Sequence, residues 1–259
     1  MKTSSLVLFA MLLFYSLSFG RENLKLPPLK RAVTYGDVRM DRVSTKNRMA
    51  PVIFSHWVHR SKYTCRVCHY ELEFAMRAKE TEVICNRGEI NTMHCTNCHD
   101  GKTSFAPKDA KGNNCSRCHT KKSKPDTAKF AALEKRLPKR SFKDQKGKEV
   151  VWIDWVRALN EGAIKPTTSL SGLAPAVGTN RTLSLEAETS GIPPAIFPHK
   201  IHEEWLDCSS CHPDIFNIKK NSTKHFSMDR ILKGEFCGAC HLSVAFPVND
   251  CARCHPGIK

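Results

Sequence analysis

Apolar residues are concentrated in a few segments of this chain. Only the first of these segments is a long continuous apolar run. Residues 6–14 are almost uninterruptedly apolar and follow the positively charged Lys2, and Ser18 and Gly20 put small residues where a signal peptidase cleaves. The run is shorter than the roughly 20 residues that a membrane-spanning helix needs. We therefore predict a signal peptide over residues 1–20, removed after export, rather than a membrane anchor.

The rest of the chain has one clear amphipathic pattern, near its middle. Apolar side chains recur there with helical spacing, and Gly162 stands where such a helix would end. The apolar positions are Val151, Trp152, Trp155, Val156 and Leu159. The polar stretch 21–49 is expected to form an extended N-terminal arm, and residues 163–194, rich in Ser, Thr, Gly and Pro, a loop.

Twelve of the 13 cysteines fall in six C-x-x-C-H motifs. This motif is typical of haem c attachment: two thiols bond to the porphyrin, and the adjacent His lies under the iron as its proximal ligand. Random placement of 13 Cys and 12 His in 259 residues would give roughly 0.03 such motifs. The predicted haem-bonded cysteines are Cys65, Cys68, Cys95, Cys98, Cys115, Cys118, Cys208, Cys211, Cys237, Cys240, Cys251 and Cys254. The predicted proximal ligands are His69, His99, His119, His212, His241 and His255.

Zinc binding and thiol redox chemistry are the other common uses of cysteine pairs. Zinc sites do not need a His directly after each pair, and a redox-active C-x-x-C has no reason to occur six times. We therefore expect six covalently bound haem c groups. Their flat, apolar rings would supply the core that a chain with 8 % aromatic residues lacks.

Exactly six histidines remain outside the motifs, one for each haem. They are His56, His59, His94, His199, His202 and His225. A lone His is more often a surface or core residue than a metal ligand. Here the match in number predicts that these residues are distal ligands, which would give six irons with two His each.

The motifs form two groups of three that align with each other. The segment Ile53–His59 (I-F-S-H-W-V-H) precedes the first group, and Ile196–His202 (I-F-P-H-K-I-H) precedes the second. In both copies, the next Cys lies six positions after the last of these His. Such self-similarity indicates a tandem repeat. The predicted organisation is a trihaem module over residues 50–120, a basic and helical linker over 121–192, and a second trihaem module over 193–259.

Two His three residues apart on a helical turn point to the same side at different heights, so each can ligate a different haem. With the three motifs that follow, each half resembles the trihaem cytochromes of the cytochrome c7 group, relatives of cytochrome c3. The resemblance implies a small haem-rich fold of loops and short α-helices with little sheet. It also implies the ligand pairs His56 with His69, His59 with His99, His94 with His119, His199 with His212, His202 with His241, and His225 with His255.

The third pair is where the two copies differ. His94 directly precedes a motif, whereas His225 lies 12 residues before the corresponding one. Met93 and Met228 are competing ligands, and a thioether would raise the potential of the haem that it ligates. The thirteenth cysteine, Cys85, is interpreted as a buried inert thiol, with an intermolecular disulfide as the alternative.

The formal charge of +16 does not by itself indicate a nucleic-acid partner, because six haems would bring twelve propionates. Residues 120–149 hold 11 Lys or Arg against four Asp or Glu. They are interpreted as a solvated linker, and docking of an acidic partner is the alternative.

These patterns predict that the protein is an electron carrier in an anaerobic respiratory chain and not an enzyme. We expect it in the periplasm or at the cell surface. Its partners would be other cytochromes, membrane or outer-membrane complexes, or protomers of a filament. The alternative is a reductase of a small oxyanion, which needs one haem with an open face. A haem-based sensor is a third possibility, although no output domain is recognisable.

Overall fold

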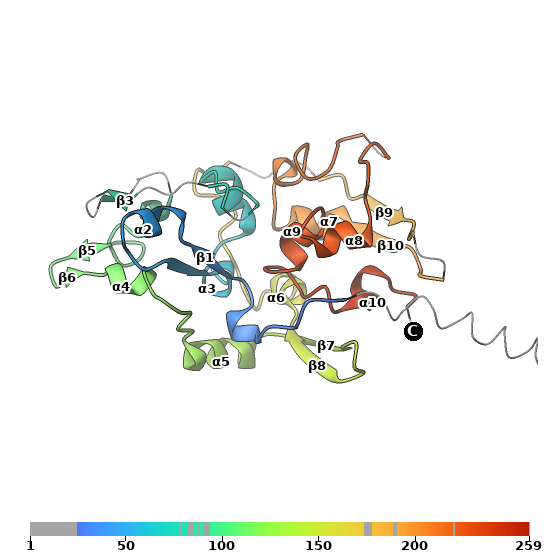
Figure 1. Cartoon of the computed structure of the whole chain (residues 1–259), viewed down its shortest axis with the longest axis horizontal. Coiled ribbons are helices and arrows are strands. Elements are labelled where there is room, and N and C mark those ends of the chain that lie inside the picture. Colours follow the sequence, from blue (N-terminus) through green and yellow to red (C-terminus); the bar gives the residue numbers. More distant parts are fainter. Residues whose placement is uncertain are drawn as a thin grey trace, which may run out of the picture.

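The computed structural model describes residues 25–77, 79–81, 85–86, 89–90, 94–173, 178–188, 191–219 and 221–258. The predicted signal peptide and Met93 lie outside these residues, as does the side chain of Cys85. The described chain consists of loops, short helices and small two-stranded antiparallel sheets (Figure 1). The predicted fold class, mainly loops and short helices with little sheet, is confirmed.

Among the described residues of the arm and the first module there are twelve short elements. They are η1 (Ala32–Thr34), β1 (Asp37–Met40), α2 (Arg42–Lys46), β2 (Val52–Ser55), α3 (His56–Arg60), η2 (Val67–Glu71), β3 (Cys85–Asn86), β4 (Glu89–Ile90), η3 (Cys95–Asn97), β5 (Lys108–Asp109), β6 (Gly112–Asn113) and α4 (Cys115–Cys118). The strands pair as β1 with β2, β3 with β4 and β5 with β6.

The linker and the second module also consist of short helices and strands. Their elements are α5 (Thr127–Arg136), β7 (Lys139–Lys143), β8 (Glu149–Ile153), α6 (Trp155–Asn160), β9 (Thr182–Leu185), β10 (Ala195–Pro198), α7 (His199–Glu203), η4 (Cys208–Ser210), α8 (Met228–Leu232), α9 (Gly238–His241) and α10 (Cys251–Cys254). Strand β7 pairs with β8, and β9 with β10.

The predicted amphipathic helix is only partly right. Val151 and Trp152 belong to strand β8, and the helix α6 begins at Trp155. Between them Asp154 accepts a hydrogen bond from the backbone N–H of Arg157, which caps the first turn of α6. A β-branched run before a capping residue therefore favours a strand where apolar spacing alone predicted a helix.

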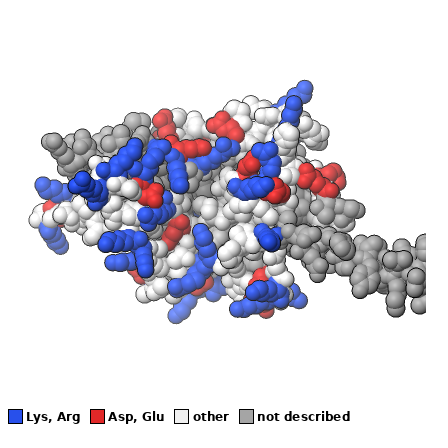
Figure 2. Space-filling model, in the orientation of Figure 1, with Lys and Arg blue, Asp and Glu red and all other residues white. Residues whose placement is uncertain are grey.

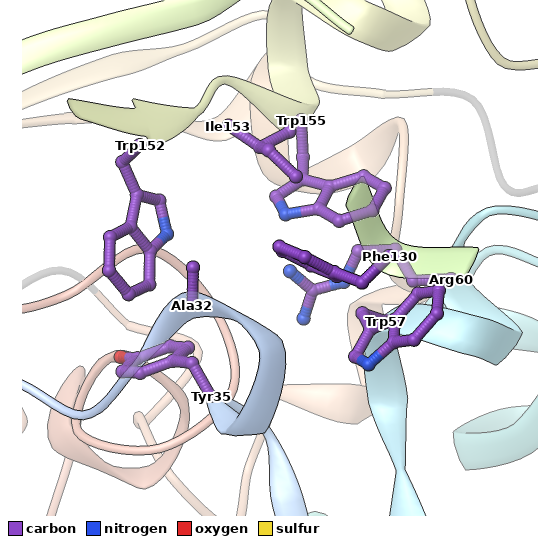
Figure 3. A pocket seen from close by; sticks show the side chains of 8 residues that line it. All are labelled: Ala32, Tyr35, Trp57, Arg60, Phe130, Trp152, Ile153 and Trp155. Carbon is purple, nitrogen blue, oxygen red and sulfur yellow. The ribbon is translucent and has the colours of Figure 1, made fainter. Parts of the chain in front are cut away.

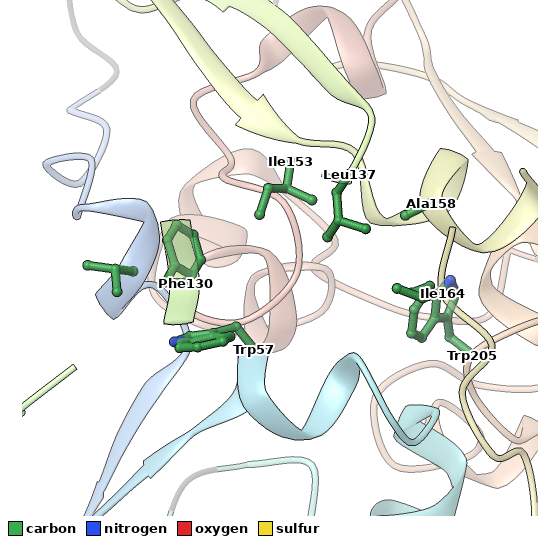
Figure 4. Close-up of a cluster of buried hydrophobic side chains, with 8 residues drawn as sticks. Trp57, Phe130, Leu137, Ile153, Ala158, Ile164 and Trp205 are labelled. Carbon is green, nitrogen blue, oxygen red and sulfur yellow. The ribbon is translucent and has the colours of Figure 1, made fainter. Parts of the chain in front are cut away.

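The side-chain core lies where the arm, the linker and both modules meet, rather than inside either module (Figure 4). Trp57 of α3 packs edge-on against Phe130 of α5 at 5.1 Å between ring centres. Trp205, which follows α7, belongs to the same cluster. The cluster is completed by Val33, Leu137, Ile153, Ala158 and Ile164. The linker thus holds the two modules together through apolar contacts.

The cations of the linker lie at the surface even though its apolar residues are buried. Lys129, Lys135 and Lys143 are exposed, whereas Phe130 and Leu137 are buried. Figure 2 shows Lys and Arg outnumbering acidic residues on the face viewed there, including the part formed by α5 and the β7–β8 hairpin. In the described part of the chain no helix is long and apolar enough to cross a membrane.

Replacing Phe130 by Ala should lower the free energy of unfolding by about 3–4 kcal/mol, because it leaves a cavity against Trp57. Denaturant titration of the holoprotein, followed by far-ultraviolet circular dichroism, measures this loss. The control is Val151→Ala, at a side chain 56 % exposed, which should change the stability by less than about 0.5 kcal/mol. Equal losses in the two variants would contradict a core at this junction.

Candidate functional site

The first predicted pair of distal ligands lies at a strand-to-helix corner. Strand β2 ends at Ser55 and α3 begins with His56. The Nδ1 atom of His56 lies 2.6 Å from the carbonyl oxygen of Gly36, and that of His59 lies 3.0 Å from the carbonyl oxygen of Ser55. Gly36 has a φ of +90°, and a Cβ there would lie 3.1 Å from the Cβ of His56. Glycine therefore lets the arm bring its carbonyl to the ring.

The second module repeats this corner. The Nδ1 atom of His199 lies 3.1 Å from the carbonyl oxygen of Arg181, and that of His202 lies 2.9 Å from the carbonyl oxygen of Pro198. Phe197 stacks on His202 with ring centres 4.3 Å apart and meets His199 edge-on at 4.8 Å.

The phenylalanine of the first copy has the same arrangement. Phe54 stacks on His59 at 4.3 Å and meets His56 edge-on at 4.8 Å. The sequence repeat is therefore also a repeat in the packing of the two histidines.

All six motif histidines are held in the same way, through Nδ1 and a backbone carbonyl. The pairs are His69 with Phe74 (2.8 Å), His99 with Phe105 (3.1 Å), His119 with Ala50 (2.6 Å), His212 with Phe216 (2.6 Å), His241 with Phe246 (3.3 Å) and His255 with Pro193 (2.7 Å). A carbonyl only accepts, so Nδ1 carries the hydrogen and Nε2 keeps its lone pair for a metal.

Two of the predicted ligand pairs lie close together. The ring centres of His59 and His99 lie 6.4 Å apart, and those of His202 and His241 lie 6.3 Å apart. Metal–imidazole bonds of about 2 Å, with each ring centre about 1.1 Å behind its nitrogen, put two imidazoles roughly 6.3 Å apart across one metal. These two pairs therefore fit an iron between them.

A third predicted pair is also brought close. His69 lies near enough to His56 to contribute to the lowering of its pKa. No ring contact joins the other three predicted pairs within the described residues. In that part of the chain there is also no group of three or more His, Cys, Asp or Glu that could by itself hold a metal ion.

His94 and His225 are the exceptions to the carbonyl pattern. His94 is buried against Phe74, with ring centres 4.7 Å apart, and its Nδ1 has no hydrogen-bond partner among the described residues. His225 is exposed, has a φ of +57°, and has no such bond within the described residues. Met228 begins helix α8 three residues further on. Within the described residues, no ring contact joins His94 to His119 or His225 to His255.

Burial keeps the buried imidazoles neutral near pH 7. It lowers the pKa of His56 to about 3 and that of His241 to about 4. Burial also lowers the pKa of His59, His69 and His202. A neutral imidazole is the form that binds a metal, so these side chains are ready to ligate without losing a proton.

An arginine of the third motif reaches the middle site of each module. In the first module Arg117 lies 3.5 Å from the centre of the Phe105 ring, and that ring lies 4.4 Å from His99. The second module has the same sequence of contacts, from arginine to phenylalanine to histidine. Arg253 lies 4.5 Å from the Phe246 ring centre, which lies 4.2 Å from His241.

Motif reasoning did not predict these contacts, although the sequence holds a signal for part of them. Both third motifs carry Arg as their second intervening residue, in C-S-R-C-H and C-A-R-C-H. The carbonyl groups that Gly36, Ala50 and Pro193 supply have no such signal in the sequence. Every residue type has a backbone carbonyl, so the residue type does not reveal which one binds a histidine.

Comparison with known proteins gives the same assignment for both halves. The family model of cytochrome c7 and related cytochrome c matches residues 52–120 and 195–256, about half of the chain. None of the curated proteins matches.

Among solved structures, a c7-type three-heme cytochrome domain is 35 % identical, covering 29 % of this chain and 91 % of that one, with a TM-score of 0.27. The C-terminal hexaheme fragment of GSU1996 is 22 % identical, covering 89 % of this chain and 99 % of that one, with a TM-score of 0.23. The N-terminal hexaheme fragment is 24 % identical, covering 86 % and 99 %, with a TM-score of 0.25.

The family match, together with the six C-x-x-C-H motifs, shows that the chain belongs to the family of cytochrome c7 and related c-type cytochromes and is a multihaem cytochrome with six covalently bound haem c groups.

Proposed function

We propose that this protein carries electrons through haems that each have two histidine ligands, and that it is not an enzyme. The observation that supports this most strongly is the shared anchoring of the histidines. Ten of the twelve hold Nδ1 against a backbone carbonyl, which leaves Nε2 for iron. An iron with both axial positions filled has no place for a substrate, so it exchanges electrons only.

The ligand pairs that we propose are those implied by the family resemblance. The neighbouring rings of His59 and His99, and of His202 and His241, support the middle pair of each module. The proximity of His69 to His56 supports the first pair. Two imidazole ligands favour a lower reduction potential than a thioether does, so we expect low-potential haems.

A reductase of a small oxyanion is the second candidate, because one observation favours it. In the part of the chain that the structure describes, no backbone carbonyl binds Nδ1 of His94 or His225 as one does in the other ten histidines. If either fails to reach its iron, the third haem of that module, at His119 or His255, keeps an open face. An open face is what substrate binding at a haem requires.

The proposed setting is the periplasm or the cell surface of a bacterium that respires without oxygen. The apolar segment at residues 6–14 and the haem attachment itself support export. The exposed cations of the linker suit redox partners with an acidic surface, since opposite charges speed the encounter of two proteins. A soluble shuttle, a subunit of a membrane-bound complex and a filament protomer all fit this arrangement.

Haem analysis of the purified, oxidised protein should give six haems per chain. Electron paramagnetic resonance should find all of them low-spin, and carbon monoxide should leave the spectrum of the reduced protein unchanged. A high-spin fraction near one haem in six, or a carbon monoxide shift, would contradict complete ligation and support the reductase.

Substituting His59→Gly should open one haem, because His59 is the proposed distal ligand of the iron at His99. We expect about one haem in six to become high-spin and to bind carbon monoxide. His202→Gly should do the same in the second module. The control is Lys62→Ala, an exposed side chain just after the same helix, which should leave all haems low-spin.

The same measurement on His94→Gly and His225→Gly decides the third pair of each module. A new high-spin haem in either variant identifies that residue as a ligand. No change would leave Met93 in the first module, Met228 in the second, or an open face as the alternatives.

A further inference from the structure

The first haem-attachment motif lies at the boundary between the two modules. The backbone N–H of Arg66, inside this motif, donates to the carbonyl oxygen of Trp205 at 2.8 Å. Its guanidinium pairs with Glu71 at 2.6 Å and with Asp207 at 3.5 Å. Helical turns η2 and η4 are therefore in contact, and the first and fourth motifs lie side by side.

The other flank of the same motif meets the fifth motif. Arg60, the last residue of α3, donates a hydrogen bond to the carbonyl oxygen of Val244. The hydroxyl of Tyr35 donates to the carbonyl oxygen of His241 at 2.9 Å. Burial raises the pKa of the Cys240 thiol to about 12, and the nearby Cys65 adds to that rise. Segments next to the first motif and residues of the fifth motif thus meet at this boundary.

Figure 3 shows the Arg60 guanidinium at this boundary, pointing into a pocket whose walls are largely aromatic. It lies 5.2 Å from the centre of the Trp155 ring. The pocket is lined by residues from five segments: the arm, α3, α5, β8 and α6. Water is largely displaced there, so a charge acts over a longer distance than it would at the surface.

The arginines around this boundary differ in whether their positive charge is paired with a carboxylate. Arg66 is paired with Glu71 and Asp207, and Arg253 is paired with Asp154 at 3.0 Å. None of the ion pairs within the described residues includes Arg60. Burial lowers the pKa of the Arg60 guanidinium, but the ordinary pKa of arginine is so high that the group stays protonated near pH 7 and contributes a positive charge.

Arg60 also breaks the symmetry between the two modules. Their middle sites share the neighbouring histidines, the phenylalanine and the arginine of the third motif. Beside His241, however, Arg60 adds a second cation that contributes to the lowering of the pKa of that imidazole. At the counterpart site Lys62 acts in the same sense on His59, so what sets the fifth site apart is that its added cation comes from the other module.

We propose that the positive charge of Arg60 raises the reduction potentials of the haems at the first and fifth motifs. An electron that passes between the modules would then reside preferentially on one of these two haems. A ferric haem loses one positive charge when it takes up an electron, and a nearby cation favours the reduced form. The inference rests on the proposed electron-transfer function.

The test compares three variants of the holoprotein with the native protein. Arg60→Met removes the charge and keeps the length of the side chain, Arg60→Gln removes the charge and keeps a donor for Val244, and Arg60→Lys keeps the charge. The control Arg39→Met removes a cation that is 53 % exposed and paired with Asp41. Nuclear magnetic resonance at successive oxidation levels follows the haem methyl signals of each haem separately.

At a fixed potential, Arg60→Met and Arg60→Gln should each lower the reduced-to-oxidised ratio of the first and fifth haems about tenfold, which corresponds to 59 mV for one electron. Arg60→Lys should keep most of the native ratio. Arg39→Met should change all six haems by less than about twofold, because solvent screens a surface charge. The two charge-removing variants differ in shape, so agreement between them assigns the effect to the charge.

Unchanged potentials in both variants, or a shift spread evenly over all six haems, would overturn the inference. A propionate that neutralises Arg60 would give that result. The haem count and the low-spin spectrum of the same samples test the proposed function separately. Six low-spin haems without a shift at the first and fifth would refute the role of Arg60 alone, whereas fewer low-spin haems would refute the proposed ligation.

Discussion

The hydrogen bond between an imidazole Nδ1–H and a backbone carbonyl is the interaction on which the arrangement of this protein depends. A histidine can offer Nε2 in a fixed direction only when its other nitrogen is held. Some of the carbonyls come from the same turn as the ring, as at His59 and Ser55. Others come from distant segments, as where Ala50 meets His119 and Pro193 meets His255. The path of the connecting chain is therefore constrained by the ligands that it must hold.

This constraint explains why the side-chain core lies between the modules. Inside each module the haem rings take the space that apolar side chains would otherwise fill. The segments that supply carbonyls must still be held in place, and the arm that carries Gly36 is held partly by the cluster around Val33 and Trp57. A cluster at the junction secures the arm and both modules at once, which a core within one module would not do.

The sequence predicts the chemistry of this protein better than its packing. Thioether attachment needs residues that are neighbours in the chain, so six C-x-x-C-H motifs suffice to predict six haems. The F-x-H-x-x-H spacing is local as well, and the structure has both copies in matching corners. A carbonyl partner, by contrast, has no residue type, and the burial of Phe130 in a Lys-rich stretch depends on a distant Trp57. The third ligand pair, at His94 and His225, is the one for which the sequence offers competing ligands, and these two histidines differ from the other ten in their surroundings. The two copies have diverged there, so neither repeat supports the other.

Where the two modules share their geometry, as at the middle site, they can differ in redox behaviour only through what lies outside the repeat. The linker supplies that difference. Asp154 caps helix α6 and also pairs with Arg253 of the sixth motif, while Arg140 of β7 pairs with the buried Asp250 at 2.8 Å. Buried charges interact strongly because little water screens them, so these residues belong to the electrostatic surroundings of the second module although they lie in the linker. A duplicated sequence can in this way produce two unequal halves, and unequal potentials are what give electron flow along a chain of chemically identical cofactors its direction.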